Sequence, residues 1–554
     1  MIKKLFPCII FALLSCTVYS QTIVSTTPEN KKVVLEEFTG IHCVWCPSGH
    51  AIAKAIQDNN PGNVFLINIH TGGFSNPLAG EPDFRTPFGN AIRSQSGVNF
   101  YPSGTVNRHI FSGGITGMDR GAWNGSANSI LAEPSNVNVA VEADINLQTS
   151  ELIVHVEGYY TANSPAGTNL LNIALLQNNT KGPQTGGNAG SNYNHMHRLV
   201  HLVTGQWGIS IPTTTTNTFV DETLTYTIPA DYNGVPVELG DLEIVAFITE
   251  TQQEVASGAG AYPTYSSANS NDAFARYIEQ IDDQCGFDIT PSVVVQNLGS
   301  DPITSLSIDY SVNSGAVETY NWTGLIDPAQ NENIELPAIS YTINPAGNTL
   351  DVTLGSDDDN SNNDASGTFD NAVTATGSVT LILNSGTNGS QITWDITNAG
   401  GTVIYSGGPY SNNQSFNIPI SLSADCYKYE VRSANGNGGS SVVVYDSASQ
   451  VLYQSTGNFG FGESSNFNSD GILGVNDNNL EGLSIYPNPA TSILNVRNAE
   501  SSTVEVYNIL GQILYTKNDI SIEEQIQVSQ FTSGTYFVKI TNGNAVKTIK
   551  FIKR

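Results

Sequence analysis

The sequence is poor in positive charge, and after its first twenty residues it has no long apolar run. Its 554 residues include only 21 Lys and Arg against 50 Asp and Glu, which gives a formal net charge of −29 at pH 7. Such an acidic surface repels the phosphates of nucleic acids, so we expect no nucleic acid partner. Because no later segment is apolar enough to span a bilayer, we expect the rest of the chain to be soluble or attached to a surface.

Motifs of several enzyme classes are also missing. The sequence contains no Gly-x-Ser-x-Gly elbow, no His-Glu-x-x-His pair, no Gly-Lys-Ser/Thr phosphate loop and no cysteine-protease signature. A hydrolase or a carbohydrate-binding protein therefore has no motif to support it. The motifs also predict no bound cofactor.

Residues 1–21 are typical of a secretory signal peptide. Two lysines precede a short apolar segment, Ile9–Leu14, and Val18–Ser20 forms a small-residue cleavage signal. An alternative makes Cys16 the lipidated residue of a lipoprotein, although Leu14 fits that pattern poorly. In either case the chain is exported, and removal of the leader with its two lysines takes the net charge from −29 to −31.

Four cysteines remain after the leader, too few for a disulfide scaffold in a chain of this length. Cys43 and Cys46 stand three positions apart at a predicted strand-to-helix turn. Two thiols in that position can close a disulfide within one helical turn and exchange electrons as a unit. Cys285 and Cys426 are either free buried thiols or a long-range bridge, and the sequence does not decide between these alternatives.

The pattern along the chain predicts a multidomain protein, with an α/β domain first and several all-β domains after it. Val33–Phe38 and Val64–Ile69 are predicted buried strands, separated by a helix over Ala51–Gln57 that begins at the cysteine pair. The predicted parts are an α/β domain (22–132), a β-sandwich (133–265), an immunoglobulin-like domain (280–370), a second β-sandwich (375–470), a linker (471–481) and a small β unit (482–554).

The order of strand, Cys-x-x-Cys, helix and strand resembles the thioredoxin fold. By that resemblance Cys43, near the helix N-terminus, is the nucleophile, and the helix dipole lowers the pKa of its thiol. Cys46 is then the resolving cysteine, Glu37 the buried acid that helps take its proton, and Pro102 the cis proline that faces the disulfide. These four residues are the predicted catalytic site, with Cys43–Cys46 as its disulfide.

Two plainer interpretations stay open. The cysteine pair could be a static disulfide that staples the first helical turn, although so small a loop gains little from closure. Glu37, at a strand edge, could simply be solvated. The sequence also departs from thioredoxin, because Val44 and Trp45 separate the cysteines and an insertion lies around Thr71–Thr86.

Three motifs occur in an order that resembles the Omp28-related outer membrane proteins of Bacteroidetes. They are Phe38–Pro47, Tyr101–Arg108 and Tyr193–Arg198. The resemblance covers residues 30 to 265 and implies a thioredoxin-like domain paired with a β-sandwich. That family has no settled activity, so the resemblance does not supply one.

Two clusters invite a metal site, and for each we favour a plainer interpretation. On a strand, His195 and His197 would share a face, with His201 nearby, but no further ligand is obvious. We favour hydrogen-bonded imidazoles on a strand between domains. The segment Asp357–Asp364 could hold Ca²⁺, but it lacks the spacing and glycine of an EF-hand, so we favour a solvated acidic turn.

The last part of the chain carries several ordered motifs. Leu483–Ala490 contains Tyr-Pro-Asn-Pro, alternating strands follow over Val504–Leu510 and Tyr536–Ile540, and Lys547–Arg554 is basic. These motifs resemble the type A C-terminal sorting domain of the type IX secretion system. The resemblance implies that residues 482–554 engage the secretion machinery and are usually cleaved, after which the protein is released or attached to surface lipopolysaccharide. Seven Lys and Arg against five Asp and Glu give this part a net charge of +2.

The two parts before it also have resemblances. Residues 285–370 resemble an immunoglobulin-like module of the CARDB type, and residues 375–470 resemble a β-sandwich of other type IX cargo. In that sandwich a strand like Cys426-Tyr427 leads to a turn with further cysteines, but the turn Asn435–Gly439 has none. Cys426 has therefore lost its usual partner, and Cys285 is the only other candidate.

Two functions follow as hypotheses for a secreted, outer-membrane or cell-surface protein. The first is a thiol-disulfide oxidoreductase in which Cys43 attacks and Cys46 resolves. The second is a non-enzymatic surface or adhesion protein that uses the thioredoxin fold as a scaffold and binds an unknown protein or glycan. The cysteine pair favours the first hypothesis, and the β domains favour the second.

Overall fold

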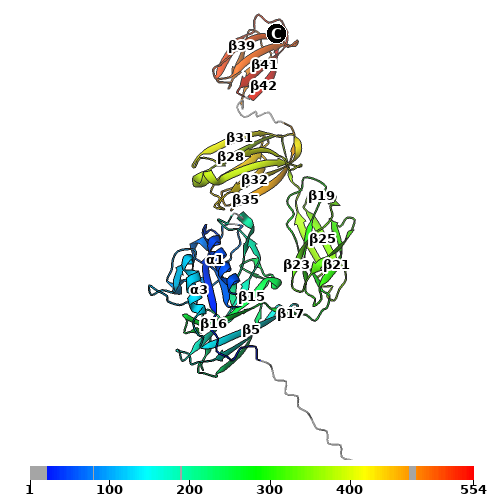
Figure 1. The fold of residues 1–554 in the computed structure, drawn as a ribbon. Helices are drawn as coiled ribbons and strands as arrows, with labels where there is room; N and C mark the ends of the chain where they lie inside the picture. Colours follow the sequence, from blue (N-terminus) through cyan, green and yellow to red (C-terminus); the bar gives the residue numbers. More distant parts are fainter. Residues whose placement is uncertain (1–21, 79, 188–189, 473–481, 544) are drawn as a thin grey trace, which may run out of the picture.

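A computed structural model describes residues 22–78, 80–187, 190–472, 482–543 and 545–554. The predicted leader and most of the predicted linker lie outside these residues. The chain is mostly β, as predicted, and its hydrophobic cores divide it into four parts (Figure 1). We name them the head (22–266), the first β unit (273–369), the second β unit (373–470) and the C-terminal unit (482–554).

A nine-stranded mixed sheet organises the head, in the order β16-β15-β7-β10-β2-β1-β3-β4, with β11 paired to β7. Strand β1 runs parallel to β2 and antiparallel to β3. The sheet continues across residue 132, so the predicted α/β and β-sandwich parts share it. Its strands are β1 (Val33–Thr39), β2 (Val64–His70), β3 (Ser103–Val106), β4 (Gly117–Asp119), β7 (Asn169–Gln177), β10 (Arg198–Leu202), β11 (Ile209–Ile211), β15 (Leu242–Glu250) and β16 (Glu254–Ala261).

The centre of this sheet is apolar on both faces, which is why β1 and β2 read as continuous apolar runs. Val33 and Leu35 pack against α1 (Cys46–Asn59) and α3 (Trp123–Leu131) on one face. Alternate residues of the same strand pack on the opposite face, which α2 (Gly89–Ser96) covers. The predicted helix at the cysteine pair is thus present, and it begins at Cys46.

A second sheet of the head packs over β7 and β15, with a shared apolar core. Its order is β12-β6-β5-β17. Its strands are β5 (Val137–Asn146), β6 (Glu151–Tyr160), β12 (Phe219–Thr227) and β17 (Thr264–Ser266). Short elements complete the head: β8 (Thr180–Gly182) with β9 (Tyr193–His195), β13 (Asp231–Tyr232) with β14 (Val235–Pro236), and the 3-10 turns η1 (Gly73–Ser75), η2 (Arg120–Ala122), η3 (Gly190–Asn192) and η4 (Leu239–Asp241).

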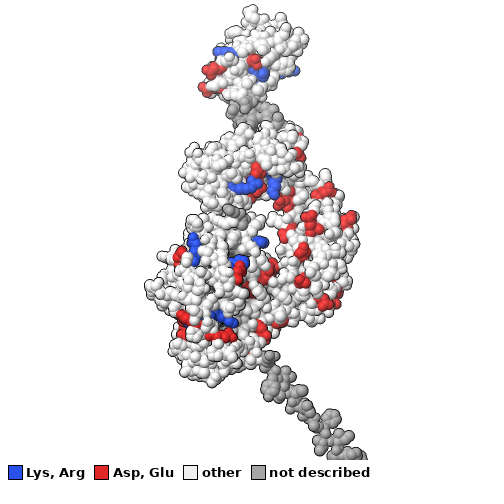
Figure 2. All heavy atoms as spheres, viewed as in Figure 1, with Lys and Arg blue, Asp and Glu red and all other residues white. Residues whose placement is uncertain are grey.

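The first β unit packs two sheets, β18-β20-β23 and β22-β21-β25-β26, around an alternating core. With the small pair β19-β24, its strands are β18 (Ala273–Ile278), β19 (Asp288–Ile289), β20 (Ser292–Asn297), β21 (Ile303–Val312), β22 (Glu318–Ile326), β23 (Asn331–Glu335), β24 (Ile339–Ser340), β25 (Asn348–Leu354) and β26 (Asp364–Phe369). Its surface is strongly acidic, because Arg276 is its only cationic residue against 15 Asp and Glu, as Figure 2 shows on the visible face.

The second β unit is also a two-sheet sandwich, with orders β27-β35-β32-β29-β30 and β31-β28-β33-β34. Its elements are β27 (Val373–Ala375), β28 (Ser378–Asn384), η5 (Gly386–Gln391), β29 (Ile392–Asn398), β30 (Val403–Gly407), β31 (Ser415–Ser421), β32 (Ala424–Ser433), β33 (Ser441–Asp446), β34 (Val451–Ser455) and β35 (Gly462–Asp470). A disulfide between Cys285 and Cys426, with Cα atoms 5.7 Å apart, joins it to the first β unit. Of the two open alternatives for these cysteines, the structure has the long-range bridge.

Carboxylates of the acidic segment Asp357–Asp364 bind the backbone at the start of the first β unit. Asp358 accepts hydrogen bonds from the backbone N–H groups of Ser270 and Asn271, and Asp357 accepts one from Ala273. These carboxylates therefore fix the chain that enters the unit. Among the described residues, no group of three or more His, Cys, Asp and Glu side chains is arranged to hold a metal ion.

The C-terminal unit packs the sheets β36-β37-β40 and β39-β38-β41-β42 around one core. Its strands are β36 (Ser484–Tyr486), β37 (Ile493–Arg497), β38 (Thr503–Asn508), β39 (Ile513–Lys517), β40 (Glu523–Gln527), β41 (Gly534–Asn542) and β42 (Ala545–Lys553). Asn488 of the Tyr-Pro-Asn-Pro motif bonds to the backbone of β42 at Lys550 and Ile552. The strand predicted to reach Leu510 ends at Asn508, whose side chain closes a turn by accepting the N–H groups of Leu510 and Gln512.

Candidate functional site

The cysteine pair lies at the start of α1, at the C-terminal end of β1. Cys43 and Cys46 form a disulfide with their Cα atoms 5.4 Å apart. Cys43 is 3% exposed and Cys46 is fully buried, whereas Val44 and Trp45 between them are 54% and 64% exposed. Both sulfurs therefore lie beneath a small apolar surface, and Cys43 is the one nearer to solvent.

Glu37 is buried beneath the same helix. A Cβ atom added at Gly49 would collide with Glu37 Oε1 and would lie 3.0 Å from Pro102 Cβ. Gly49 follows Cys46 by one helical turn on the buried side of α1, so it lets the acid and the proline approach the helix below the cysteine pair. The alternative of a solvated Glu37 is wrong, because its side chain is fully buried.

Burial raises the pKa of Glu37 well above its usual range, and the positive charge of Arg120 only partly opposes this effect. Neither carboxylate oxygen has a hydrogen-bond partner in the described part of the chain. Both observations favour the protonated carboxyl of Glu37 over its carboxylate.

Pro102 follows a cis peptide bond from Tyr101. Strand β3 begins at the next residue and pairs with β1 so that Gly104 lies opposite Glu37. The pairing of β3 with β1 thus places Pro102 beside Glu37 and α1. All four residues of the predicted site lie in one region of the head.

A loop distant in sequence covers the cysteine turn, and the sequence analysis missed it. The side-chain amide of Gln184 donates to the carbonyl oxygens of Gly40 and Cys43, at 3.2 and 3.0 Å. The N–H of Thr185 donates to Ile41 at 2.7 Å. The hydroxyl of Thr185 also bonds to the carbonyl oxygen of Asn435, so the second β unit contacts this cover directly.

His50 and Tyr193 were missed as well. His50 lies one turn after Cys46, and its Nε2 atom is 2.9 Å from Thr39 Oγ1 and 3.8 Å from Glu37 Oε1. Its Nδ1 atom is 2.8 Å from the hydroxyl of Tyr193. Burial, with a smaller contribution from His197, lowers the pKa of His50 to about 4, and burial raises the pKa of Tyr193 to about 12.

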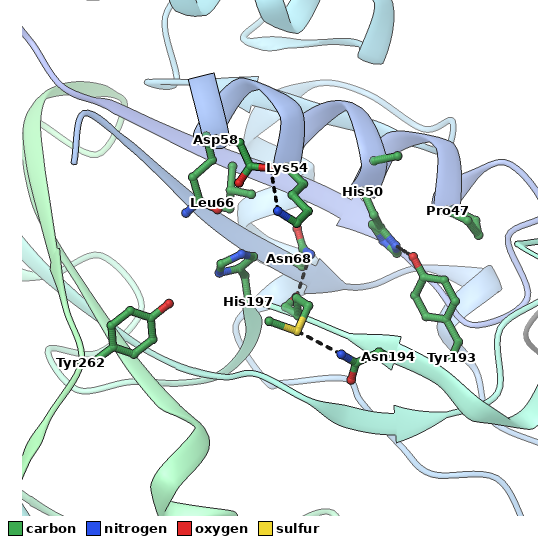
Figure 3. Close-up of a pocket in the computed structure, with 13 residues that line it drawn as sticks. Pro47, His50, Lys54, Asp58, Leu66, Asn68, Tyr193, Asn194, His197 and Tyr262 are labelled. Carbon is green, nitrogen blue, oxygen red and sulfur yellow. Dashed lines mark hydrogen bonds and ion pairs between the residues drawn. The ribbon is translucent and has the colours of Figure 1, made fainter. Parts of the chain in front are cut away.

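A pocket of about 420 Å³ opens beside α1 (Figure 3). His50 and Tyr193 line one end of it, and Tyr262 lines it from the β16 side of the head. The dashed contact in Figure 3 joins the His50 ring to the Tyr193 hydroxyl at the pocket wall. The hydrogen-bonded pair therefore connects the surroundings of Glu37 to a pocket that opens at the surface.

The three histidines considered as metal ligands make separate contacts and do not converge on one site. His195 packs against His70 with ring centroids 5.2 Å apart, and burial lowers the pKa of His195 to about 3. His197 has a left-handed backbone (φ 51°), which breaks the strand period, and its Nδ1 bonds to Glu243 at 2.8 Å. His201 stacks on Tyr226. The expectation that His195 and His197 share a strand face is thus wrong.

The motif that ends at Arg108 has a structural role. Arg108 donates two hydrogen bonds to the carboxylate of Glu36, at 2.8 and 2.6 Å, and both side chains are buried. Asn107, with φ 51°, accepts the N–H of Val34. The segment therefore fixes β1, and with it the position of Glu37 on the opposite face of that strand.

Two family models match the chain. Residues 89–259 match the family described as outer membrane protein Omp28, and residues 484–554 match the secretion system C-terminal sorting domain. Both resemblances inferred from the motifs are thereby confirmed. The Omp28 match includes Pro102 but begins after Glu37 and the cysteine pair.

Several known proteins are similar to parts of the chain. The structure of HBP35 of Porphyromonas gingivalis is 16% identical with a TM-score of 0.36, covering 55% of this chain and 98% of that one. A domain of the outer membrane lipoprotein Omp28 from Porphyromonas gingivalis is 19% identical with a TM-score of 0.18, covering 24% of this chain and 92% of that one. Beta-agarase D of Zobellia galactanivorans is 34% identical over 70 residues, which are 13% of this chain and 14% of that protein.

The chain is thus an exported protein, secreted or located at the outer membrane or cell surface. It combines an Omp28 region with a C-terminal sorting domain, and the latter implies handling by the type IX secretion machinery. In the described residues, no helix has both the length and the apolar character needed to cross a membrane.

Proposed function

We propose that the head is a thioredoxin-like module that oxidises pairs of protein thiols at the cell surface. The observation that carries this proposal is the position of the Cys43–Cys46 disulfide at the start of α1, above a buried acid and beside a cis proline. The arrangement of β1, β2 and β3, with α1 and α3 on one face and α2 on the other, supports the thioredoxin-like assignment.

The reaction has two exchange steps. A substrate thiolate attacks Cys43 Sγ, which forms a mixed disulfide and breaks the Cys43–Cys46 bond, and the released Cys46 thiolate takes the proton of Glu37. A second substrate thiol, after losing its proton, attacks its partner sulfur and releases Cys43. The substrate loses two electrons and the cysteine pair gains them. The α1 N-terminus stabilises the Cys43 thiolate, and a low-molecular-weight disulfide then reoxidises the pair.

The test is an assay on the full chain with a peptide that contains two thiols, in the presence of oxidised glutathione. We expect turnover in the native chain and none in Cys43→Ser. With a peptide that contains a single thiol, Cys46→Ser should accumulate a mixed disulfide between Cys43 and the peptide, visible by mass spectrometry, because neither Cys46 nor a second peptide thiol is present to resolve it. The matched control is the Cys285→Ser, Cys426→Ser double variant, which should keep its turnover. Absence of turnover in the native chain, with Cys43–Cys46 still oxidised under mild reductant, would contradict the proposal.

A second candidate is a non-enzymatic surface protein that uses the head as a scaffold for binding a protein or glycan. One observation favours it: Gln184 and Thr185 cover the cysteine turn, and the second β unit contacts Thr185. In that case the cysteine pair should stay oxidised in the same assay. Removal of the C-terminal unit after export, and attachment to surface lipopolysaccharide, belong to either candidate. Peptides from beyond Gly482 in mature surface material would contradict that removal.

A further inference from the structure

Glu37 has no direct route to solvent. Its carboxylate lies between β1, Gly49 of α1 and Pro102, and its side chain is fully buried. In the proposed reaction this carboxyl gives its proton to Cys46 and is left as a buried carboxylate while the pair is reduced, so neutralising it takes a proton from solvent. Apolar packing conducts no protons, and this transfer therefore needs polar side chains or water.

His50 and Tyr193 form a polar connection from this acid to the pocket in Figure 3. His50 Nε2 is 3.8 Å from Glu37 Oε1, and His50 Nδ1 is 2.8 Å from the Tyr193 hydroxyl. Both rings line the pocket of about 420 Å³. Polar contacts of catalytic groups are often long in the resting state and tighten during reaction, so the 3.8 Å gap fits a transfer contact.

We propose that His50 and Tyr193 relay protons between Glu37 and the solvent of this pocket, an inference that rests on the proposed thiol exchange. After Glu37 has protonated Cys46, His50 Nδ1 takes the hydroxyl proton of Tyr193 in the same step in which His50 Nε2 gives its proton to the Glu37 carboxylate, so the imidazole is neutral before and after the transfer. Tyr193 then takes a proton from water. At reoxidation Cys46 gives up its proton and the relay runs in reverse, so one proton enters while the pair is reduced, one leaves when the pair is reoxidised, and no electrons move along the relay.

Burial keeps His50 neutral, and a charge on the neighbouring His197 would add to that effect. His70 on β2 and His195 are also near His50, and burial lowers the pKa of both. At the inner end, Arg120 is the positive charge that acts on Glu37. A neutral imidazole has one donor and one acceptor nitrogen, which the relay requires.

A proton relay differs from a purely structural contact in how the reaction rate responds to pH, to buffer and to deuterated solvent. We expect Tyr193→Phe to slow turnover of the peptide by the full chain about 10- to 100-fold at pH 7, because a proton donor is lost. The loss of rate should shrink in concentrated small buffers, because a buffer acid in the pocket can give a proton to His50 in place of Tyr193. The solvent deuterium isotope effect of the native chain should also fall in the variant. Asn194→Ala, which changes the same pocket wall outside the relay, is the matched control and should behave like the native chain.

Removal of the imidazole gives a second readout. His50→Ala opens the relay to the pocket, so added imidazole should restore part of its lost rate. If the native chain exchanges thiols while Tyr193→Phe and a folded His50→Ala keep the native rate and pH profile, the relay is wrong and the proposed function stands. If the native chain exchanges no thiols, both proposals are wrong.

Discussion

The head and the three β units differ in what they bury. All eight histidines of the chain lie in the head, which also buries Glu37, Arg198 and the Glu36–Arg108 ion pair. The β units are built on alternating strands with apolar residues inside, and they bury fewer ionisable side chains, among them Asp446, Glu524 and Lys553. Buried ionisable groups destabilise a fold unless they are paired or neutral, and they are common at functional sites. The contrast therefore agrees with the proposal that the reactive site lies in the head.

The largest expected effect is on the buried ion pair of the head. Arg108→Met would leave the Glu36 carboxylate buried without its bidentate partner, which we expect to cost about 3–5 kcal/mol of unfolding free energy. Calorimetry of the full chain should show a lower transition for the head and an unchanged one for the C-terminal unit. The control Lys54→Met breaks an exposed pair with Asp58 and should cost about 0.5 kcal/mol or less. Equal losses of unfolding free energy in the two variants would contradict the expected difference between the buried and the exposed ion pair.

The next effect concerns the β units alone. Replacing Cys285 and Cys426 together by Ser removes a bridge that spans 141 positions, and we expect a loss of about 2–4 kcal/mol. Chemical denaturation with a fluorescent probe in each part would localise the loss. The matched comparison is the double variant Cys43→Ser, Cys46→Ser. The disulfide that it removes closes a far shorter loop, so its loss should cost less unfolding free energy. A larger loss from the short loop would contradict this prediction.

Acid should weaken the head before it weakens the β units. His50 and His195 have folded-state pKa values lowered to about 4 and about 3 by burial. At a pH between these values and about 6.5, the unfolded chain binds protons that the folded head does not, so stability falls as pH falls. We expect a loss of about 2 kcal/mol per histidine on going from pH 7 to pH 5. The C-terminal unit contains no histidine, so its transition should stay constant over this range.

The smallest predicted effect has the opposite pH dependence, because Glu37 makes the head less stable as the pH rises. The raised pKa of Glu37 means that the folded head binds a proton that the unfolded chain has lost, so stability falls as pH rises between the two pKa values. The loss is about 1.4 kcal/mol per pH unit in that window. Glu37→Gln should remove this slope and leave the head more stable than native at alkaline pH. An unchanged slope in the variant would show that Glu37 is ionised in the folded state.

The sequence predicted the elements that local pattern determines. Strands β1 and β2 were visible as apolar runs, and α1 between them as a helix that starts at the cysteine pair. The burial of Glu37 was expected only from the resemblance to thioredoxin, because the contact of Gly49 with the loop before β3, on which it depends, leaves no local pattern. Gln184 also gave no signal, since it lies about 140 positions from Cys43 in a polar loop. Contacts of this kind depend on the packing of distant segments, which no local pattern records.

The Cys285–Cys426 bridge has a mechanical consequence. Tension between the head and the C-terminal unit follows the covalent path, which passes from residue 285 directly to residue 426. Most of the first β unit and the first half of the second lie on the bypassed segment and carry no load. Unfolding either of these segments therefore does not lengthen the protein, whereas the same chain without the bridge could extend by roughly 450–500 Å. The bridge therefore limits how far this exported protein can lengthen under pulling force.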